Sequence, residues 1–78
     1  MKITVKLFTI LKKYTSGRLD EDGGVDIPEG SILEDLAEHL GIPGNVVKIY
    51  LLNGKPAQAA AVLHHGDRVK MFSFVGGG

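Results

Sequence analysis

The sequence ends on three glycines, Gly76, Gly77 and Gly78, which directly follow a strongly apolar segment over residues 68–75. Because glycine has no Cβ, such a tail can adopt almost any backbone conformation and can enter a narrow channel in a partner protein. The terminal carbonyl carbon of Gly78 is unhindered, so an activated carboxylate there could be attacked by a nucleophile. The tail is therefore the leading candidate for the functional group. The alternative is a frayed chain end, where small residues are common.

Other residues with chemical potential form weaker patterns. The chain has no cysteine, which excludes a thiol nucleophile, a disulfide and cysteine metal ligands. His64 and His65 are adjacent, but neighbouring side chains of an extended segment point apart and no third ligand accompanies them. The acidic residues 20–22 lack the further ligands and the closing glutamate of a calcium loop. We therefore expect solvated turns at both places and predict no metal site.

The composition is that of an ordinary globular domain. Hydrophobic residues make up 44% of the 78 residues, and nine acidic residues balance nine basic ones. This neutral balance argues against long-range attraction to nucleic acid or to acidic membranes. The sequence shows no run of about 18 apolar residues that could span a bilayer, and no basic-then-apolar leader. We therefore expect a cytoplasmic protein that binds neither nucleic acid nor membrane.

Hydrophobic periodicity predicts four strands and one helix. A strand begins at residue 2, where Ile3, Val5 and Leu7 alternate with polar residues, and runs to about residue 10. Residues 25–28 form a short strand that proline ends. Ser31 and Glu34 match a capping box, which predicts a helix over about residues 31–40. Further strands are expected over 46–52 and 68–75, with a tight hairpin turn at Asn53 and Gly54, whereas residues 56–62 show no clear pattern.

This order of elements predicts an α+β fold, a mixed four- to five-stranded sheet covered by one main helix. The first two strands would pair as a hairpin, and the first and last strands would lie side by side in the middle. We expect residues 1–75 to form a single domain and 76–78 a flexible tail. The core positions in phase with each element are Ile3, Val5, Leu7, Leu33, Leu36, Leu40, Ile49, Leu51, Val69 and Met71.

Residues out of phase with this core would form a second apolar surface, on the sheet face that the helix leaves open. If the first and last strands are neighbours, this surface lies next to the tail, and exposed apolar patches of this kind usually mark a partner surface. The alternative is that segment 15–24 or 57–62 folds over it. Outward positions in the first strand are Lys6, Phe8 and Ile10. We predict partner docking by Phe8, Ile10, Lys70, Phe72, Phe74 and Val75.

Three features in order link the sequence to a known family. Leu63, Gly66, Asp67 and Val69 form a Leu-x-x-Gly-Asp-x-Val pattern that precedes a strand and the terminal glycines. Leu52-Asn53-Gly54 is similar to a Val-Asn-Gly turn, and residues 2–8 form the opening strand. The sequence thereby resembles, over nearly its whole length, the MoaD/ThiS-like sulfur carriers with a ubiquitin-like β-grasp fold, which include the molybdopterin synthase small subunit and the thiamine-pathway carrier. It departs from that pattern at Ser73 and Phe74, where prolines often precede the tail in the molybdopterin branch, and at Gly76, a third glycine.

The resemblance implies a sulfur carrier that is not itself an enzyme and holds no cofactor. An E1-like adenylating enzyme would use ATP to activate the Gly78 carboxylate, and a persulfide on another protein would supply sulfur to give a thiocarboxylate. Gly76 and Gly77 would be recognised as bare backbone. The acceptor would be a synthase large subunit or another sulfur-acceptor enzyme of cofactor biosynthesis, with molybdopterin synthesis favoured and thiamine or another product left open. The remaining alternatives are a ubiquitin-like modifier joined to lysines through Gly78 and a non-catalytic β-grasp binding module.

Overall fold

The computed structural model describes residues 1–8, 23–42 and 49–73. In this part of the chain the elements follow in the order β1 (Lys2–Leu7), β2 (Gly24–Asp26), α1 (Leu33–His39), β3 (Ile49–Leu52), β4 (Lys55–Ala57) and β5 (Arg68–Phe72). Strand β4 arises where the sequence showed no clear pattern. The predicted extensions of the first strand over residues 9 and 10, of the third over 46–48 and of the last over 74 and 75 lie outside the described residues.

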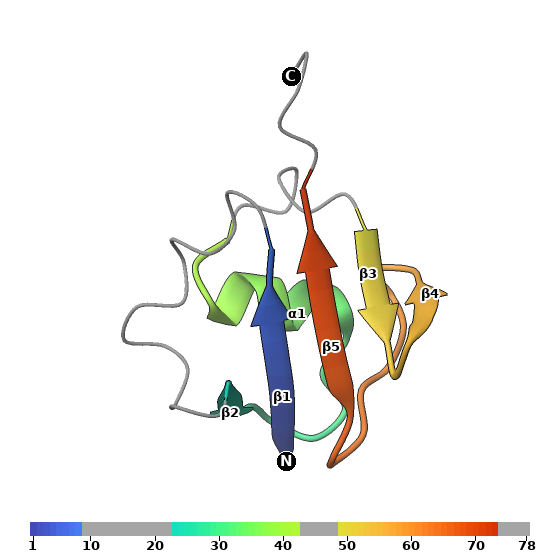
Figure 1. Ribbon diagram of the computed structural model, residues 1–78. Helices are drawn as coiled ribbons and strands as arrows, with labels where there is room; N and C mark the ends of the chain where they lie inside the picture. Colours follow the sequence, from blue (N-terminus) through green and yellow to red (C-terminus); the bar gives the residue numbers. More distant parts are fainter. Residues whose placement is uncertain (9–22, 43–48, 74–78) are drawn as a thin grey trace.

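The strands form one mixed sheet in the order β2-β1-β5-β3-β4 (Figure 1). Strand β1 pairs antiparallel with β2 and parallel with β5, so the first and last strands are neighbours in the centre. Strand β3 pairs antiparallel with both β5 and β4. The predicted hairpin of the first two strands and the central placement of the terminal strands are confirmed.

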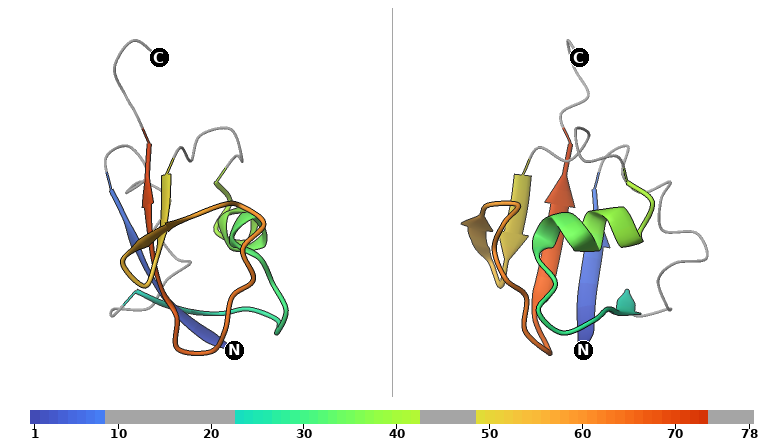
Figure 2. Two further views of the ribbon diagram at one scale, coloured as in Figure 1. Left: turned by 90° about the vertical axis from the view of Figure 1, so that its right-hand side faces the viewer. Right: turned by 180° about the vertical axis from the view of Figure 1, so that it is seen from behind.

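Helix α1 covers one face of this sheet, and the edge view separates the two layers (Figure 2). The core lies between them. Leu33, Leu36 and Ala37 of the helix are fully buried against strand residues of the same cluster, including Ile3, Val5, Val69 and Met71. The α+β architecture of one sheet under one helix is therefore the predicted one.

The helix begins later than predicted, and its first turn is satisfied by a distant segment. Ser31 is not the N-cap, because its hydroxyl donates to the Pro28 carbonyl across 2.6 Å and closes the preceding turn. Ile32 takes the N-cap position, and its backbone N–H donates to Asp35 Oδ2 across 3.0 Å. The N–H groups of Leu33 and Glu34 donate to the carbonyls of Ala61 and Ala59, at 3.0 and 2.9 Å. Backbone of residues 59–61 thus supplies the acceptors that a serine cap would otherwise provide.

The core phase predicted for the third strand is wrong by one residue. Tyr50 is the buried residue of β3 and pairs with buried Met71, whereas Ile49 and Leu51 pair with Phe72 and Lys70. Because paired residues share a face of the sheet, Ile49 and Leu51 lie on the face away from α1. Burial raises the pKa of the Tyr50 hydroxyl, and the nearby Glu34 carboxylate raises it further.

The hairpin between β3 and β4 has the predicted turn. Asn53 and Gly54 both have positive φ angles, 53° and 84°, as a type I′ turn requires. Pro56 in β4 is compatible with the sheet because β4 is an edge strand.

Candidate functional site

The face of the sheet away from α1 carries an apolar cluster, here called the outer-face patch, made of Phe8, Ile49, Leu51 and Phe72. The rings of Phe8 and Phe72 stack, with centroids 4.5 Å apart and planes 9° apart. The Phe8 backbone N–H donates to the Met71 carbonyl across 3.1 Å, which holds residue 8 beside the end of β5. All four side chains of the patch are half-buried, so each keeps part of its surface in contact with solvent.

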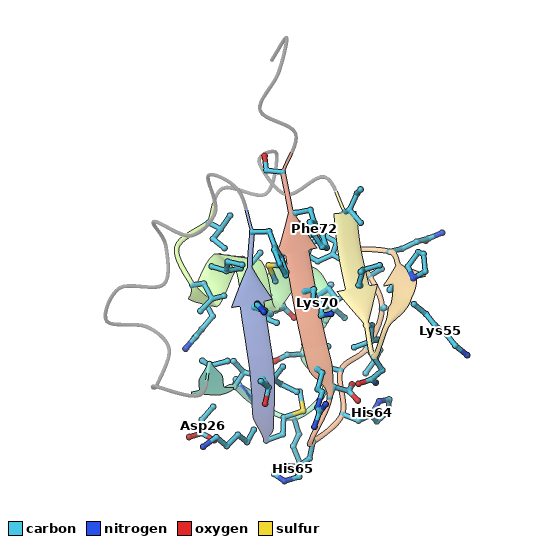
Figure 3. The ribbon with its side chains drawn as sticks, viewed as in Figure 1. Asp26, Lys55, His64, His65, Lys70 and Phe72 are labelled. Atoms are coloured by element: carbon cyan, nitrogen blue, oxygen red, sulfur yellow. The ribbon has the colours of Figure 1, made fainter. Side chains whose placement is uncertain are left out.

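Three basic side chains continue the same face away from the patch and are here called the cationic row: Lys6, Arg68 and Lys70. Lys6 and Lys70 are directly paired positions of the parallel strands β1 and β5, and Arg68 pairs with Thr4. The Lys6 ammonium group also lies 5.4 Å from the centroid of the Phe8 ring, within cation–π range. Lys70 and Phe72 project from β5 on the side opposite the helix (Figure 3).

The structure describes only some of the predicted site residues. Phe8, Lys70 and Phe72 lie together on the outer face, as the alternation of the two strands indicated. Ile10, Phe74, Val75 and the tail glycines Gly76, Gly77 and Gly78 lie outside the described residues. Strand β5 ends at Phe72, six residues before Gly78 in the sequence. Because an extended chain spans at most about 3.6 Å per residue, Gly78 is tethered within roughly 22 Å of Phe72.

The segment over residues 57–62 does not cover the outer face. Its carbonyls bind the first turn of α1, Leu63 is buried, and Ala57, Ala59 and Ala61 contact the core on the helix side. Of the other segment considered as a cover, residues 15–22 lie outside the described residues. No described element therefore crosses the patch.

The sequence pattern missed three residues of this face. The sequence predicts Ile49 and Leu51 in the core, but the run Ile-Tyr-Leu-Leu gives no alternation from which to choose a face. The predicted docking surface lacks Arg68. Its position two residues before Lys70 is the signal that could have identified it, since residues i and i+2 of a strand share a face.

The two histidines lie at the other end of the molecule and have structural contacts (Figure 3). His65 Nδ1 accepts a hydrogen bond from the Lys2 backbone N–H across 3.0 Å. His64 donates its backbone N–H to Asp67 Oδ2 across 2.8 Å, and its ring nitrogen lies 3.9 Å from the same carboxylate. In residues 1–8, 23–42 and 49–73, no group of three or more histidine, cysteine, aspartate or glutamate side chains could hold a metal ion. The same residues include no helix long and apolar enough to cross a membrane.

Comparison with known proteins identifies the family. The family model of the ThiS family matches residues 5–78, nearly the whole chain. The chain belongs to the ThiS family, whose members are small sulfur carriers of the ubiquitin-like β-grasp fold. The comparison with curated protein sequences gives no significant match.

Solved structures show the same fold at low sequence identity. The crystal structure of SAMP1 from Haloferax volcanii, 21% identical, superposes with a TM-score of 0.71 over 100% of both chains. A second crystal structure, of the H. volcanii small archaeal modifier protein 1, is 20% identical and has a TM-score of 0.70 over 95% of this chain and 98% of that one. A complex of subunits 1 and 2 of the molybdopterin-converting factor from Helicobacter pylori includes a chain that is 19% identical, with a TM-score of 0.56 over 100% of both chains.

Proposed function

We propose that this protein carries sulfur as a thiocarboxylate on Gly78 and donates it in cofactor biosynthesis, with a molybdopterin-type cofactor as the first recipient to test. The observation that carries the proposal is the run of three glycines at the end of a ThiS-family match that extends to residue 78. In the sequence, this run begins four residues after the central strand β5 ends at Phe72. A carboxylate placed there can leave the domain surface without unfolding the sheet.

The chemistry needs activation, because a carboxylate is a stable anion and a poor electrophile. An adenylating partner would join the Gly78 carboxylate to the α-phosphate of ATP and release pyrophosphate. The terminal sulfur of a protein persulfide would then attack the acyl carbon and displace AMP. A second thiol would then attack the S–S bond of this acyl disulfide, forming a disulfide with the donor sulfur and releasing the thiocarboxylate on Gly78. The bare backbone of Gly76 and Gly77 would let the tail approach both partner sites closely.

In this proposal the outer-face patch is the surface on which partners dock. The stacked rings of Phe8 and Phe72 lie at the end of β5 from which the tail departs, so a partner that takes the tail also meets the patch. Aromatic side chains tend to supply the energetic centre of protein contacts. Ile10, Lys70, Phe74 and Val75 belong to the same proposed surface.

The test is the intact mass of the protein purified from its native host. We expect a species heavier by the difference between one sulfur and one oxygen atom, sensitive to an alkylating reagent and absent when Gly78 is removed. Mixing this species with a synthase large subunit and the precursor of a molybdopterin-type cofactor should return the mass to that of the carboxylate. Absence of the heavier species under conditions where the adenylate forms would contradict the proposal.

The same measurement separates the carrier from a ubiquitin-like modifier. Both functions would share the acyl-adenylate, and the fold is common to both. A modifier would appear as adducts in which Gly78 is joined to lysines of larger proteins, with no thiocarboxylate on the free protein.

A further inference from the structure

The charged side chains of the described residues are unevenly distributed, although the formal net charge of the chain is zero. The three side chains of the cationic row, Lys6, Arg68 and Lys70, lie on the outer face of the sheet. The outer face also carries Lys2 paired with one acidic residue, Asp26, and Lys55 lies on the helix-side face of the edge strand β4. On the opposite side, α1 and the turn before it carry exposed acidic residues and no lysine or arginine; these are Glu29, Glu34, Asp35 and Glu38. A molecule of this kind has little net attraction to a charged partner but is turned by the partner's field as it approaches.

Repulsion among the side chains of the cationic row should lower the stability of the sheet. Lys6 and Lys70 are directly paired on adjacent strands, where like charges destabilise the pairing. None of the three side chains of the row forms an ion pair with a carboxylate of residues 1–8, 23–42 and 49–73, where the ion pair found is that of His64 with Asp67. Together with Thr4 and Val69, the row lines a recess of about 330 Å³ that opens to solvent.

We infer that the cationic row is a recognition surface for an acidic protein surface, and that it orients the sulfur carrier so that the outer-face patch and the tail reach the partner together. The inference rests on the proposed function for the identity of that partner, an adenylating enzyme or a sulfur acceptor. The row and the patch adjoin on β1 and β5, since the Lys6 ammonium group lies over the Phe8 ring, 5.4 Å from its centroid, and Lys70 is two residues from Phe72. A partner complementary to both has carboxylates beside an apolar contact, and the acidic side of α1 turns away from it.

The first experiment does not depend on sulfur chemistry. The probe is a synthetic peptide of alternating leucine and glutamate, titrated into the isotope-labelled full chain at low salt, with a leucine–lysine peptide as its counterpart. We expect the acidic peptide, but not the basic one, to shift the amide signals of β1 and β5. Added salt should weaken this binding. Binding of both peptides alike, or of neither, would overturn the inference.

A matched pair of substitutions tests the location. Lys70→Glu and Lys55→Glu change the net charge equally, and both lysines are exposed strand residues, but Lys55 lies on the edge strand β4 outside the row (Figure 3). Lys70→Glu should weaken the acidic peptide about tenfold or more and raise the melting temperature by about 1–5 °C, because it removes the repulsion with Lys6. Lys55→Glu should leave affinity within about twofold. Equal weakening by both variants would overturn the assignment to the row.

Two further measurements distinguish a partner protein from a second copy of this chain, and the inference from the proposed function. Sedimentation of the wild-type chain over a range of concentrations should show no self-association; an association abolished by both Lys70→Glu and Glu38→Lys would assign the row to a second copy and overturn the inference. With the adenylating enzyme, Lys70→Glu should raise KM about tenfold and leave kcat unchanged, whereas an unchanged KM would overturn the inference. Peptide binding as expected with no adenylation of the wild type would instead contradict the proposed function alone.

Discussion

The side chain of Asn53 donates a hydrogen bond to Asp67 across 3.0 Å and so joins two turns that are 14 residues apart in the sequence. Asn53 Oδ1 accepts the Arg68 backbone N–H at 2.9 Å, and the Asn53 backbone N–H donates to the Arg68 carbonyl at 2.7 Å. Asp67 in turn accepts the His64 backbone N–H. The Asn-Gly and Gly-Asp motifs, by which the sequence resembles its family, are therefore one structural unit, here called the turn clamp, made of Asn53, His64, Asp67 and Arg68.

The first prediction concerns Asn53 in the turn clamp. Asn53→Ala removes two side-chain hydrogen bonds. It also places alanine, which lacks a polar side chain to stabilise the left-handed conformation, at a φ of 53°. We expect it to lower the free energy of unfolding by about 2–3 kcal/mol. Asn53→Gly loses the same bonds but tolerates the backbone angle, so it should cost about 1 kcal/mol less. Urea denaturation of both variants measures the difference, and equal losses would show that the backbone angle carries no cost.

The second prediction is the pH dependence that Asp67 confers. Burial opposes the charge of this carboxylate, but hydrogen bonds from the Asn53 side chain and the His64 backbone N–H, with His64 nearby, outweigh it and lower the pKa of Asp67. Because the pKa is lower in the folded than in the unfolded state, the stabilisation is fully present above the unfolded pKa of about 4 and is lost as pH falls through the folded value. Asp67→Asn should therefore destabilise the protein by about 1–2 kcal/mol at neutral pH.

The measurement for Asp67 is the free energy of unfolding of both proteins between pH 7 and about pH 2, a range that starts above the ordinary pKa of an aspartate and extends well below it. The difference between wild type and Asp67→Asn should shrink steadily in the acidic part of this range. A difference that stays constant down to the lowest pH would assign the loss to packing rather than to charge.

The third prediction compares two leucines, both of which the sequence pattern predicts to be in the core. Leu36 of α1 is fully buried, whereas Leu51 of β3 lies on the outer face. Leu36→Ala should cost about 2–5 kcal/mol through the cavity it leaves, a large part of the stability of so small a domain. Leu51→Ala should cost less than about 1.5 kcal/mol, because its side chain is partly solvated in the folded state. If denaturant titrations show comparable losses of unfolding free energy for the two variants, Leu51 is buried in the core.

The contrast between these leucines shows what the sequence could predict. Alternating polar and apolar residues place Ile3, Val5 and Leu7 correctly, because a strand with one solvated face shows its phase directly. In β3 every residue is apolar, and the phase is decided by pairing with β5, a long-range contact that no local pattern contains. For that reason the outer-face patch includes Ile49 and Leu51, which the sequence pattern assigns to the core.

The start of the helix was mispredicted for a related reason. A serine followed three residues later by a glutamate satisfies the local capping pattern, and Ser31 has a nearer acceptor in Pro28. The N–H groups of the first helical turn find their acceptors in Ala59 and Ala61, more than 20 residues away in the sequence. Tertiary hydrogen bonds therefore moved the boundary, while the helical spacing of Leu33, Leu36 and Leu40 predicted the buried face correctly.

The fourth prediction concerns the tail. Deletion of Gly77 and Gly78, or addition of residues after Gly78, should abolish adenylation, because the reacting carboxylate is lost or displaced. The melting temperature should change little, since the deletion begins five residues beyond the end of β5 at Phe72. Pyrophosphate exchange measures the first effect and thermal denaturation the second. An extended variant that is still adenylated at Gly78 would contradict the free-carboxylate mechanism.

The last prediction concerns the stacked pair Phe8 and Phe72. Serine at either position removes a ring from the patch while leaving the core face of its strand intact. We expect each change to weaken binding to the adenylating enzyme or to the synthase large subunit by about 2 kcal/mol or more. The effect on folding should be smaller, near the roughly 0.5–1.5 kcal/mol that an aromatic pair contributes beyond its buried area.

The control for this pair is Val62→Ser, which removes an exposed apolar side chain, 50% accessible, from a residue whose backbone bridges to Ile32 at the start of α1. It should leave partner affinity unchanged. Calorimetric titration of the four proteins, with denaturant curves for each, separates binding from folding. If both phenylalanine variants unfold, or if both bind as tightly as Val62→Ser, the stacked rings belong to the fold rather than to partner docking, and recognition would then rest on the tail and on the cationic row.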